Sequence, residues 1–137
     1  MSWRLAALAL VFAWFLLGGI GHFVLPDAFT SVVPPYIPRP REVVLATGAF
    51  EIAAALALLR GAWRERVGWA LMAFTICVTP VHVDMLIHAD RYAIGAPALW
   101  ARLLFQPVYV WIIWFATRPE APQPHSGASV ISATDQP

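Results

Sequence analysis

The chain of 137 residues has no lysine, only one cysteine, and little charge of either sign. Charged residues make up 12% of it, roughly half the share found in soluble domains. Its 9 basic and 8 acidic residues leave a net charge of +1, so no basic stripe is available for binding nucleic acid. The single cysteine excludes an internal disulfide and a paired-thiol redox motif. Because Cys77 lies in an apolar run, we expect its thiol to be buried.

Apolar residues dominate what remains, at 60% of the sequence with a mean hydropathy of +0.67. So few charges could not cover a globular surface, and the length allows one compact domain. A membrane-spanning helix needs about 20 apolar residues, and the runs lack the alternation of barrel strands. We therefore predict an all-α fold, a four-transmembrane-helix antiparallel bundle within residues 1–117. Its helices are expected at about residues 3–23, 43–60, 66–88 and 98–117.

The segments outside these helices differ in kind. A Pro-rich stretch, residues 24–41, cannot form one continuous helix, and we expect it to lie extended on the outer membrane surface. Residues 118–137 change abruptly to Pro, Ser, Gly and Gln, which predicts a disordered tail. The first apolar run resembles a signal peptide in its early arginine, but it is long and has no A-x-A cleavage site. We therefore expect it to be retained as the first crossing.

Arginine placement indicates an orientation. Antiparallel helices put one group of arginines on the side of both termini: Arg4, Arg60, Arg64, Arg66 and Arg118. A smaller group falls on the other side: Arg39, Arg41 and Arg91, with Arg102 just inside. The positive-inside rule then predicts a multi-pass protein of the inner cell membrane with both termini in the cytoplasm.

Polar residues gather in the outer half of the predicted bundle. At 1.5 Å of rise per residue, Glu51 and Gln106 lie roughly 12 Å below the outer surface, and His82 roughly 8 Å below it. His22 and Arg102 lie nearer that surface. Ionisable residues inside a membrane usually mark a functional site. We therefore predict that these side chains bind a ligand, and we assign no catalytic and no metal-binding residue.

Helical spacing refines this set. Arg102 and Gln106 are one turn apart and share a face. His82 and Asp84 point roughly 200° apart around their helix, so Asp84 is excluded from the cluster and matched instead to His88, one turn along.

A purely structural explanation stays open for each residue. Glu51 could hydrogen-bond to Gln106 or Thr47 and lock two helices together. Arg102 could pair with Glu51 or reach the lipid headgroups, and His22 could be a solvated helix cap. Haem ligation by His22 and His82 is disfavoured, because the two histidines lie at different depths.

From about Gly18 to Phe115 the chain resembles the DoxX-like family of four-helix membrane proteins. The resemblance is carried by Gly-Ile-Gly-His-Phe-Val-Leu-Pro at 19–26, Val-Val-Pro-Pro-Tyr-Ile-Pro at 32–38, Thr-Gly-Ala-Phe-Glu-Ile at 47–52, Thr-Pro-Val-His-Val-Asp-Met at 79–85 and Arg-Leu-Leu-Phe-Gln at 102–106. It departs from the family where His82 replaces an asparagine, and where Leu104 replaces a proline. That family takes its name from a subunit associated with thiosulfate:quinone oxidoreduction. The resemblance therefore implies a four-helix bundle with a polar centre and a redox partner.

Together these features predict a non-catalytic membrane subunit, or a bundle that binds a small quinone-like ligand and is linked to a membrane oxidoreductase. Its expected partners are the lipid bilayer, that oxidoreductase and a second copy of the chain. Two alternatives stay open. One is a small proton-coupled transporter that works as an oligomer, in which Glu51 titrates during transport. The other is an enzyme acting on a lipid-soluble substrate, with Glu51 and His82 as acid and base.

Overall fold

The computed structural model describes residues 2–92 and 95–119, and it contains helices and no strand within those residues. Four long helices follow one another, with short elements between them. In chain order the elements are α1 (Trp3–Val24), α2 (Pro26–Thr30), α3 (Pro40–Leu58), the 3-10 turn η1 (Gly61–Trp63), α4 (Arg64–Ile87), the 3-10 turn η2 (Ala89–Arg91) and α5 (Ala96–Thr117). The predicted tail lies outside the described residues from position 120 onward.

Local sequence signals explain where α1 begins and ends. The Ser2 hydroxyl accepts a hydrogen bond from the Leu5 amide at 3.2 Å, which caps the first turn. The helix ends at Val24, because Pro26 disfavours the α conformation for the residue before it. Pro26 in turn occupies the first turn of α2, where its missing N–H costs nothing.

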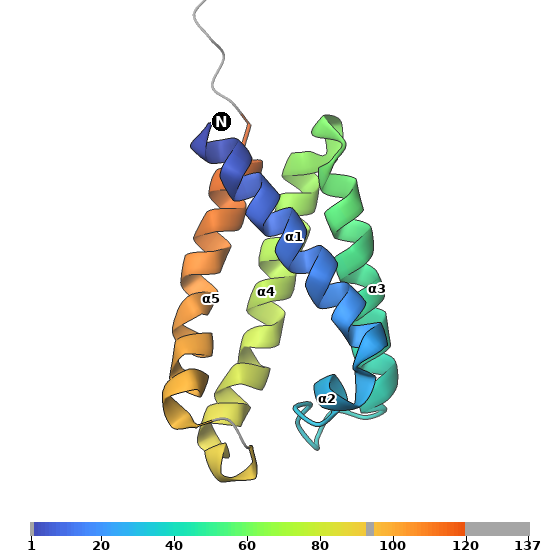
Figure 1. Cartoon of the computed structure of the whole chain (residues 1–137), viewed down its shortest axis with the longest axis vertical. Coiled ribbons are helices and arrows are strands. Elements are labelled where there is room, and N and C mark those ends of the chain that lie inside the picture. The colour runs from blue at the N-terminus through green and yellow to red at the C-terminus, as the bar shows by residue number, and fades with distance from the viewer. Residues whose placement is uncertain (1, 93–94, 120–137) are drawn as a thin grey trace, which may run out of the picture.

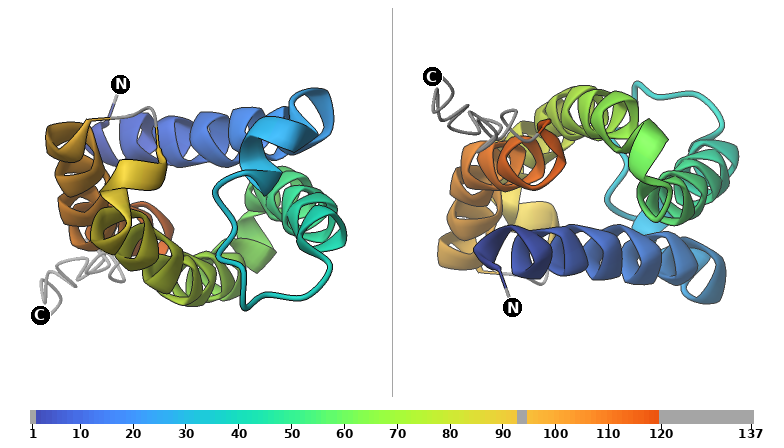
Figure 2. Two further views of the ribbon diagram at one scale, coloured as in Figure 1. Left: turned by 90° about the horizontal axis from the view of Figure 1, so that it is seen from below. Right: turned by 90° about the horizontal axis from the view of Figure 1, so that it is seen from above.

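Consecutive long helices run in opposite directions, and the start of α1 lies at the same end of the molecule as the end of α5 (Figure 1). We call this the terminal end and the opposite one the α2 end. Seen along the helices, α1 slants across one side from α5 to α3, and α4 lies on the side away from it (Figure 2). α3 and α4 are joined at η1 and diverge toward the α2 end (Figure 1).

The Pro-rich segment differs from the prediction. Instead of remaining extended, it forms the short helix α2, and α3 starts at Pro40 rather than at residue 43. Proline tolerates the first turn of a helix, so both elements begin on one. Arg39 enters α3 in the left-handed region with φ of 53°. Arg41 then pairs with Asp27 of α2 at 2.8 Å, which ties the segment's two ends together.

The buried core lies mostly in the half toward the terminal end, where α1, α3, α4 and α5 converge. Its buried members are Val11, Phe15, Ala54, Ala55, Leu58, Leu71, Met72, Tyr109, Ile113 and Ala116. The prediction for Cys77 was wrong, because its side chain is exposed on α4. An apolar run has no polar face to mark its outside, so the burial of one member cannot be read from composition.

Two close helix crossings depend on glycine. At the α1–α3 crossing, a Cβ on Gly19 would lie 2.8 Å from the Gly48 carbonyl oxygen. At the α4–α5 crossing, a Cβ on Gly68 would overlap the side chain of Thr117. Small residues at such positions let two helix backbones approach, as is usual where helices pack in lipid.

Three segments are long and apolar enough to cross a membrane: Trp3–Val24, Gly61–Ile87 and Ala96–Thr117. α3 has 19 residues but carries Arg41, Glu42 and Glu51, so its composition alone does not establish a crossing. Large apolar side chains are exposed on the outside of all three apolar segments, for example Leu17 at 68%, Trp69 at 61% and Trp111 at 59%.

Candidate functional site

Glu51 lies where α3 packs against α1. Its Oε2 would be 3.0 Å from a Cβ built on Gly18, so the carboxyl group covers the bare backbone of α1 at that glycine. Glu51 is also close enough to Tyr109 of α5 for the two groups to interact electrostatically. Within the described part of the chain, Glu51 makes no hydrogen bond and no ion pair with Arg102, Gln106 or Thr47. The helix-locking pairs considered for it are therefore not formed.

Tyr109 is the residue that sequence reasoning missed. Its side chain is 3% exposed, and its hydroxyl has no hydrogen-bond partner among the described residues. The ring packs against Trp14, Phe15 and Phe105 with centroid separations of 5.2, 5.8 and 5.4 Å. Buried phenol hydroxyls normally find a partner, so an unpaired one beside a carboxyl group calls for an explanation.

His82 and Gln106 are brought together as predicted for the cluster. Gln106 Nε2 lies 2.9 Å from His82 Nδ1, which links α4 to α5. The same Nδ1 lies 3.2 Å from the Val78 carbonyl oxygen of its own helix, so this ring nitrogen has a hydrogen-bond partner on each of α4 and α5. Arg102 is exposed but close enough to His82 for an electrostatic interaction. His82 and Gln106 thus form a hydrogen-bonded pair, and the Arg102 cation lies at the edge of that pair.

His22 lies at the junction of α1, α2 and α3, with hydrogen-bond partners different from those of His82 and Gln106. Its Nδ1 is 2.7 Å from the Val44 carbonyl oxygen and 3.1 Å from the Thr47 hydroxyl. Its ring centroid is 4.1 Å from that of Phe29 in α2. The histidine is half-buried and contacts α2 and α3, so its ring is held by packing and hydrogen bonding rather than by solvent alone.

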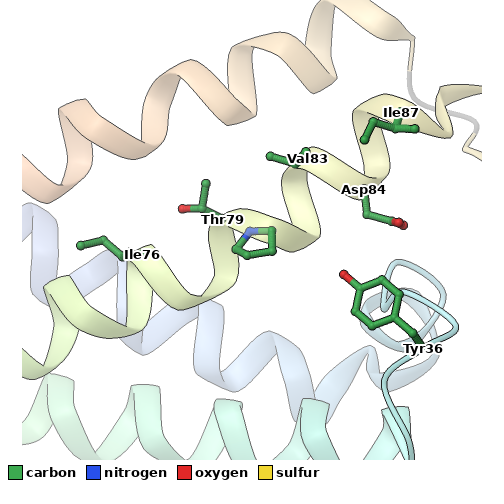
Figure 3. Close-up of a pocket in the computed structure, with 7 residues that line it drawn as sticks. Tyr36, Ile76, Thr79, Val83, Asp84 and Ile87 are labelled. Atoms are coloured by element: carbon green, nitrogen blue, oxygen red, sulfur yellow. The ribbon is translucent and has the colours of Figure 1, made fainter.

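A second polar feature lies on a different face of α4. A groove with a volume of about 610 Å³ is lined by Tyr36, Ile76, Thr79, Pro80, Val83, Asp84 and Ile87. Figure 3 shows the α4 residues along one face of the helix, with Asp84 projecting toward the segment that carries Tyr36. The predicted pairing of Asp84 with His88 is confirmed, with 3.3 Å between Asp84 Oδ1 and His88 Nδ1.

Asp84 also influences the loop after α4. Partial burial, with the negative charge of Asp84 as a second cause, raises the pKa of the Tyr92 phenol, while Arg91 opposes the shift. Asp84, His88, Arg91 and Tyr92 therefore form one connected polar group at the α2 end. Sequence spacing separated Asp84 from His82 correctly, but nothing in the sequence placed Tyr36 beside it.

Residues 8–117 match a family model described as a domain of unknown function, DUF8561. The chain belongs to this family. The matched region runs from α1 through the last residue of α5, so every residue of the two polar features lies within the DUF8561 domain. Searches of the curated proteins and of the solved structures found no match to the chain.

In residues 2–92 and 95–119, no three side chains of His, Cys, Asp or Glu come together as a group that could hold a metal ion. The residues that do meet are hydrogen-bonding groups set among aromatic rings. Such a surface can orient a polar group on an otherwise apolar molecule.

Proposed function

We propose that the protein is a four-helix antiparallel membrane bundle, with α3 as the fourth crossing, that binds a small quinone-like molecule between its helices. It carries out no reaction of its own and serves as a membrane subunit linked to an oxidoreductase. This proposal agrees with the resemblance to DoxX-like proteins. Its membrane part is supported by the three long apolar helices and by the large apolar side chains that they expose.

The observation that carries the ligand proposal is the buried, unpaired hydroxyl of Tyr109, which lies within electrostatic range of Glu51. A buried polar group without a partner costs about 1–3 kcal/mol. A quinone carbonyl that accepts the Tyr109 hydrogen bond would remove that cost. Trp14, Phe15 and Phe105 would offer an apolar, aromatic wall to the ring of such a ligand.

His82 on α4 and Gln106 on α5 provide a second anchor. Since Nδ1 of His82 is occupied by the Gln106 amide and the Val78 carbonyl oxygen, Nε2 is the ring atom left to meet a ligand. A quinone has two carbonyl groups on opposite sides of one ring. The pair on α4 and α5 could therefore hold one carbonyl while Tyr109 holds the other.

The experiment is native mass spectrometry of the protein purified in mild detergent, combined with thermal unfolding. We expect a retained molecule with the mass of a quinone or a related isoprenoid. Tyr109→Phe should reduce its retention by roughly threefold to tenfold, the value of one hydrogen bond. The same change should leave the ligand-free protein as stable as before or more so, because it removes an unpaired hydroxyl.

Tyr92→Phe is the matched control, since Tyr92 lies in the loop after η2 and away from Glu51. It should change neither retention nor stability. Equal retention by the wild type and Tyr109→Phe would contradict the ligand proposal. A marked loss of stability in ligand-free Tyr109→Phe would mean instead that the hydroxyl is a structural group.

A further inference from the structure

The groove on α4 has a polar end and an apolar end. Ile76, Pro80, Val83 and Ile87 recur at the spacing of one helical face and form its wall. Asp84 lies three residues before the end of α4, or about 4.5 Å below it. Ile76 lies about 12 Å further toward the middle of the helix. The polar group is thus near the end of the helix, and the apolar wall runs from there toward the bundle's middle.

Only one of the two carboxylate oxygens of Asp84 has a polar partner at this position. One carboxylate oxygen, Oδ1, faces His88 at 3.3 Å, but Oδ2 is fully buried and finds no hydrogen-bond partner in the described structure. Pro80 leaves the Ile76 carbonyl without its helical N–H as well. The groove therefore offers acceptors and a negative charge, and its complement is a hydrogen-bond donor that carries positive charge.

The opening of the groove restricts what can occupy it. Ile76, Val83 and Ile87 are 59%, 38% and 69% exposed, so the apolar wall is open to the outside along its length. In a membrane, that outside is lipid. A volume of about 610 Å³ lies within the range of about 300–1,000 Å³ that ligand clefts have. An acyl chain fits a long apolar groove that is open sideways.

We propose that this groove binds one phospholipid with a primary-ammonium headgroup, whose ammonium donates a hydrogen bond to Asp84 and whose acyl chain lies along α4. The site is separate from the one that contains Glu51 and Tyr109. Tyr36, on the Pro-rich segment, faces Asp84 from the other side of the groove (Figure 3).

The chemistry of Asp84 selects among lipids. A buried carboxylate oxygen without a partner needs an N–H, which an ethanolamine headgroup has and a choline headgroup lacks. Both headgroups carry the same charge, so simple charge attraction would not distinguish them. A preference for ethanolamine over choline is therefore the specific signature of this site.

The experiment uses the full chain, stripped of lipid in detergent and then mixed with equal amounts of phosphatidylethanolamine and phosphatidylcholine bearing the same acyl chains. Native mass spectrometry reports the ratio of the two adducts. We expect the wild type to favour phosphatidylethanolamine by about tenfold, as for a hydrogen bond to a charged group. Asp84→Asn should bring the ratio close to one, while the matched control Asp90→Asn should keep it, because Asp90 is exposed in η2.

A second pair of variants tests the groove itself. Val83→Trp fills it and should reduce the retention of both lipids several-fold. Cys77→Trp adds the same bulk at an exposed position of α4 that does not line the groove, and it should leave retention unchanged. Equal binding of the two lipids by the wild type would overturn the proposal. An unchanged preference for phosphatidylethanolamine in Asp84→Asn would also overturn it. If Asp84→Asn does not fold, equal lipid retention by Val83→Trp and Cys77→Trp would overturn it instead.

Discussion

The backbones of Gly19 and Gly48 approach so closely that neither residue has room for a side chain. A Cβ on Gly19 would lie 2.8 Å from the Gly48 carbonyl oxygen, and one on Gly48 would lie 2.5 Å from His22 Cβ. This crossing brings α1 against α3 at the level of His22. The hydrogen bond from His22 to the Val44 carbonyl, at 2.7 Å, depends on the same approach.

Gly48→Ala is the first prediction. The added methyl group would force α1 away from α3, because the atoms that it meets belong to backbone and to a Cβ rather than to a flexible chain end. Overpacking of this kind costs about 1–3 kcal/mol. Thermal unfolding of the purified protein, followed by circular dichroism, should show the loss. Gly61→Ala is the control, since nothing lies within 4 Å of that position. Equal stability of the two variants would contradict the close crossing.

The second prediction concerns the α4–α5 crossing at the terminal end. Thr117 donates a hydrogen bond to the Ile113 carbonyl at 2.7 Å, so its side chain is held in place over Gly68. Gly68→Ala should therefore destabilise the protein by about 1–3 kcal/mol. Thr117→Gly removes the atoms that the new methyl would meet.

The double variant Gly68→Ala/Thr117→Gly gives the decisive comparison in the same unfolding assay. Residues in contact show non-additive effects on stability, so the double variant should be more stable than the sum of the two single losses predicts. Additive losses would indicate that Gly68 and Thr117 do not touch.

The third prediction separates a hydrogen bond from mere proximity at His82 and Gln106. Gln106→Leu removes the amide from His82 Nδ1, which keeps the Val78 carbonyl oxygen at 3.2 Å, and should cost about 0.5–1.5 kcal/mol of stability, the net value of one hydrogen bond. His82→Leu should cost more, about 1–3 kcal/mol, because it strands the Gln106 amide. Replacing both residues with leucine leaves no stranded amide and should be less damaging than the sum of the two single losses. A double variant that loses the full sum of the single effects would show that the two side chains act independently.

The main features of the fold followed from length and hydropathy. Apolar runs of about the right length gave three segments whose composition suits a membrane. The start of α3 was missed by three residues, because prolines usually signal the end of a helix and here Pro40 begins one. Helix α2 was missed for the same reason.

The site was harder to predict than the fold. Residue spacing along α4 predicted that Asp84 and His82 face different directions and that Asp84 contacts His88. Both predictions depend only on the geometry of a single helix. The contacts between helices depend on how each helix is rotated, which spacing does not give. Glu51 was therefore expected beside Gln106, yet it lies against Gly18 and near Tyr109. Tyr109 itself was overlooked because a tyrosine among aromatic residues is typical of a packed core.

The last prediction tests whether α3 crosses the membrane. Its 19 residues span about 28 Å, close to the hydrocarbon thickness of about 30 Å. Ser31 and Ala62 are exposed and flank α3 at its two ends. In a Cys77→Ser background, we expect Ser31→Cys and Ala62→Cys to react with a membrane-impermeant maleimide from opposite sides. Arginine placement predicts that Ala62→Cys reacts from the cytoplasm. Labelling of both positions from one side would contradict the fourth crossing, because the two ends of α3 would then share one aqueous face.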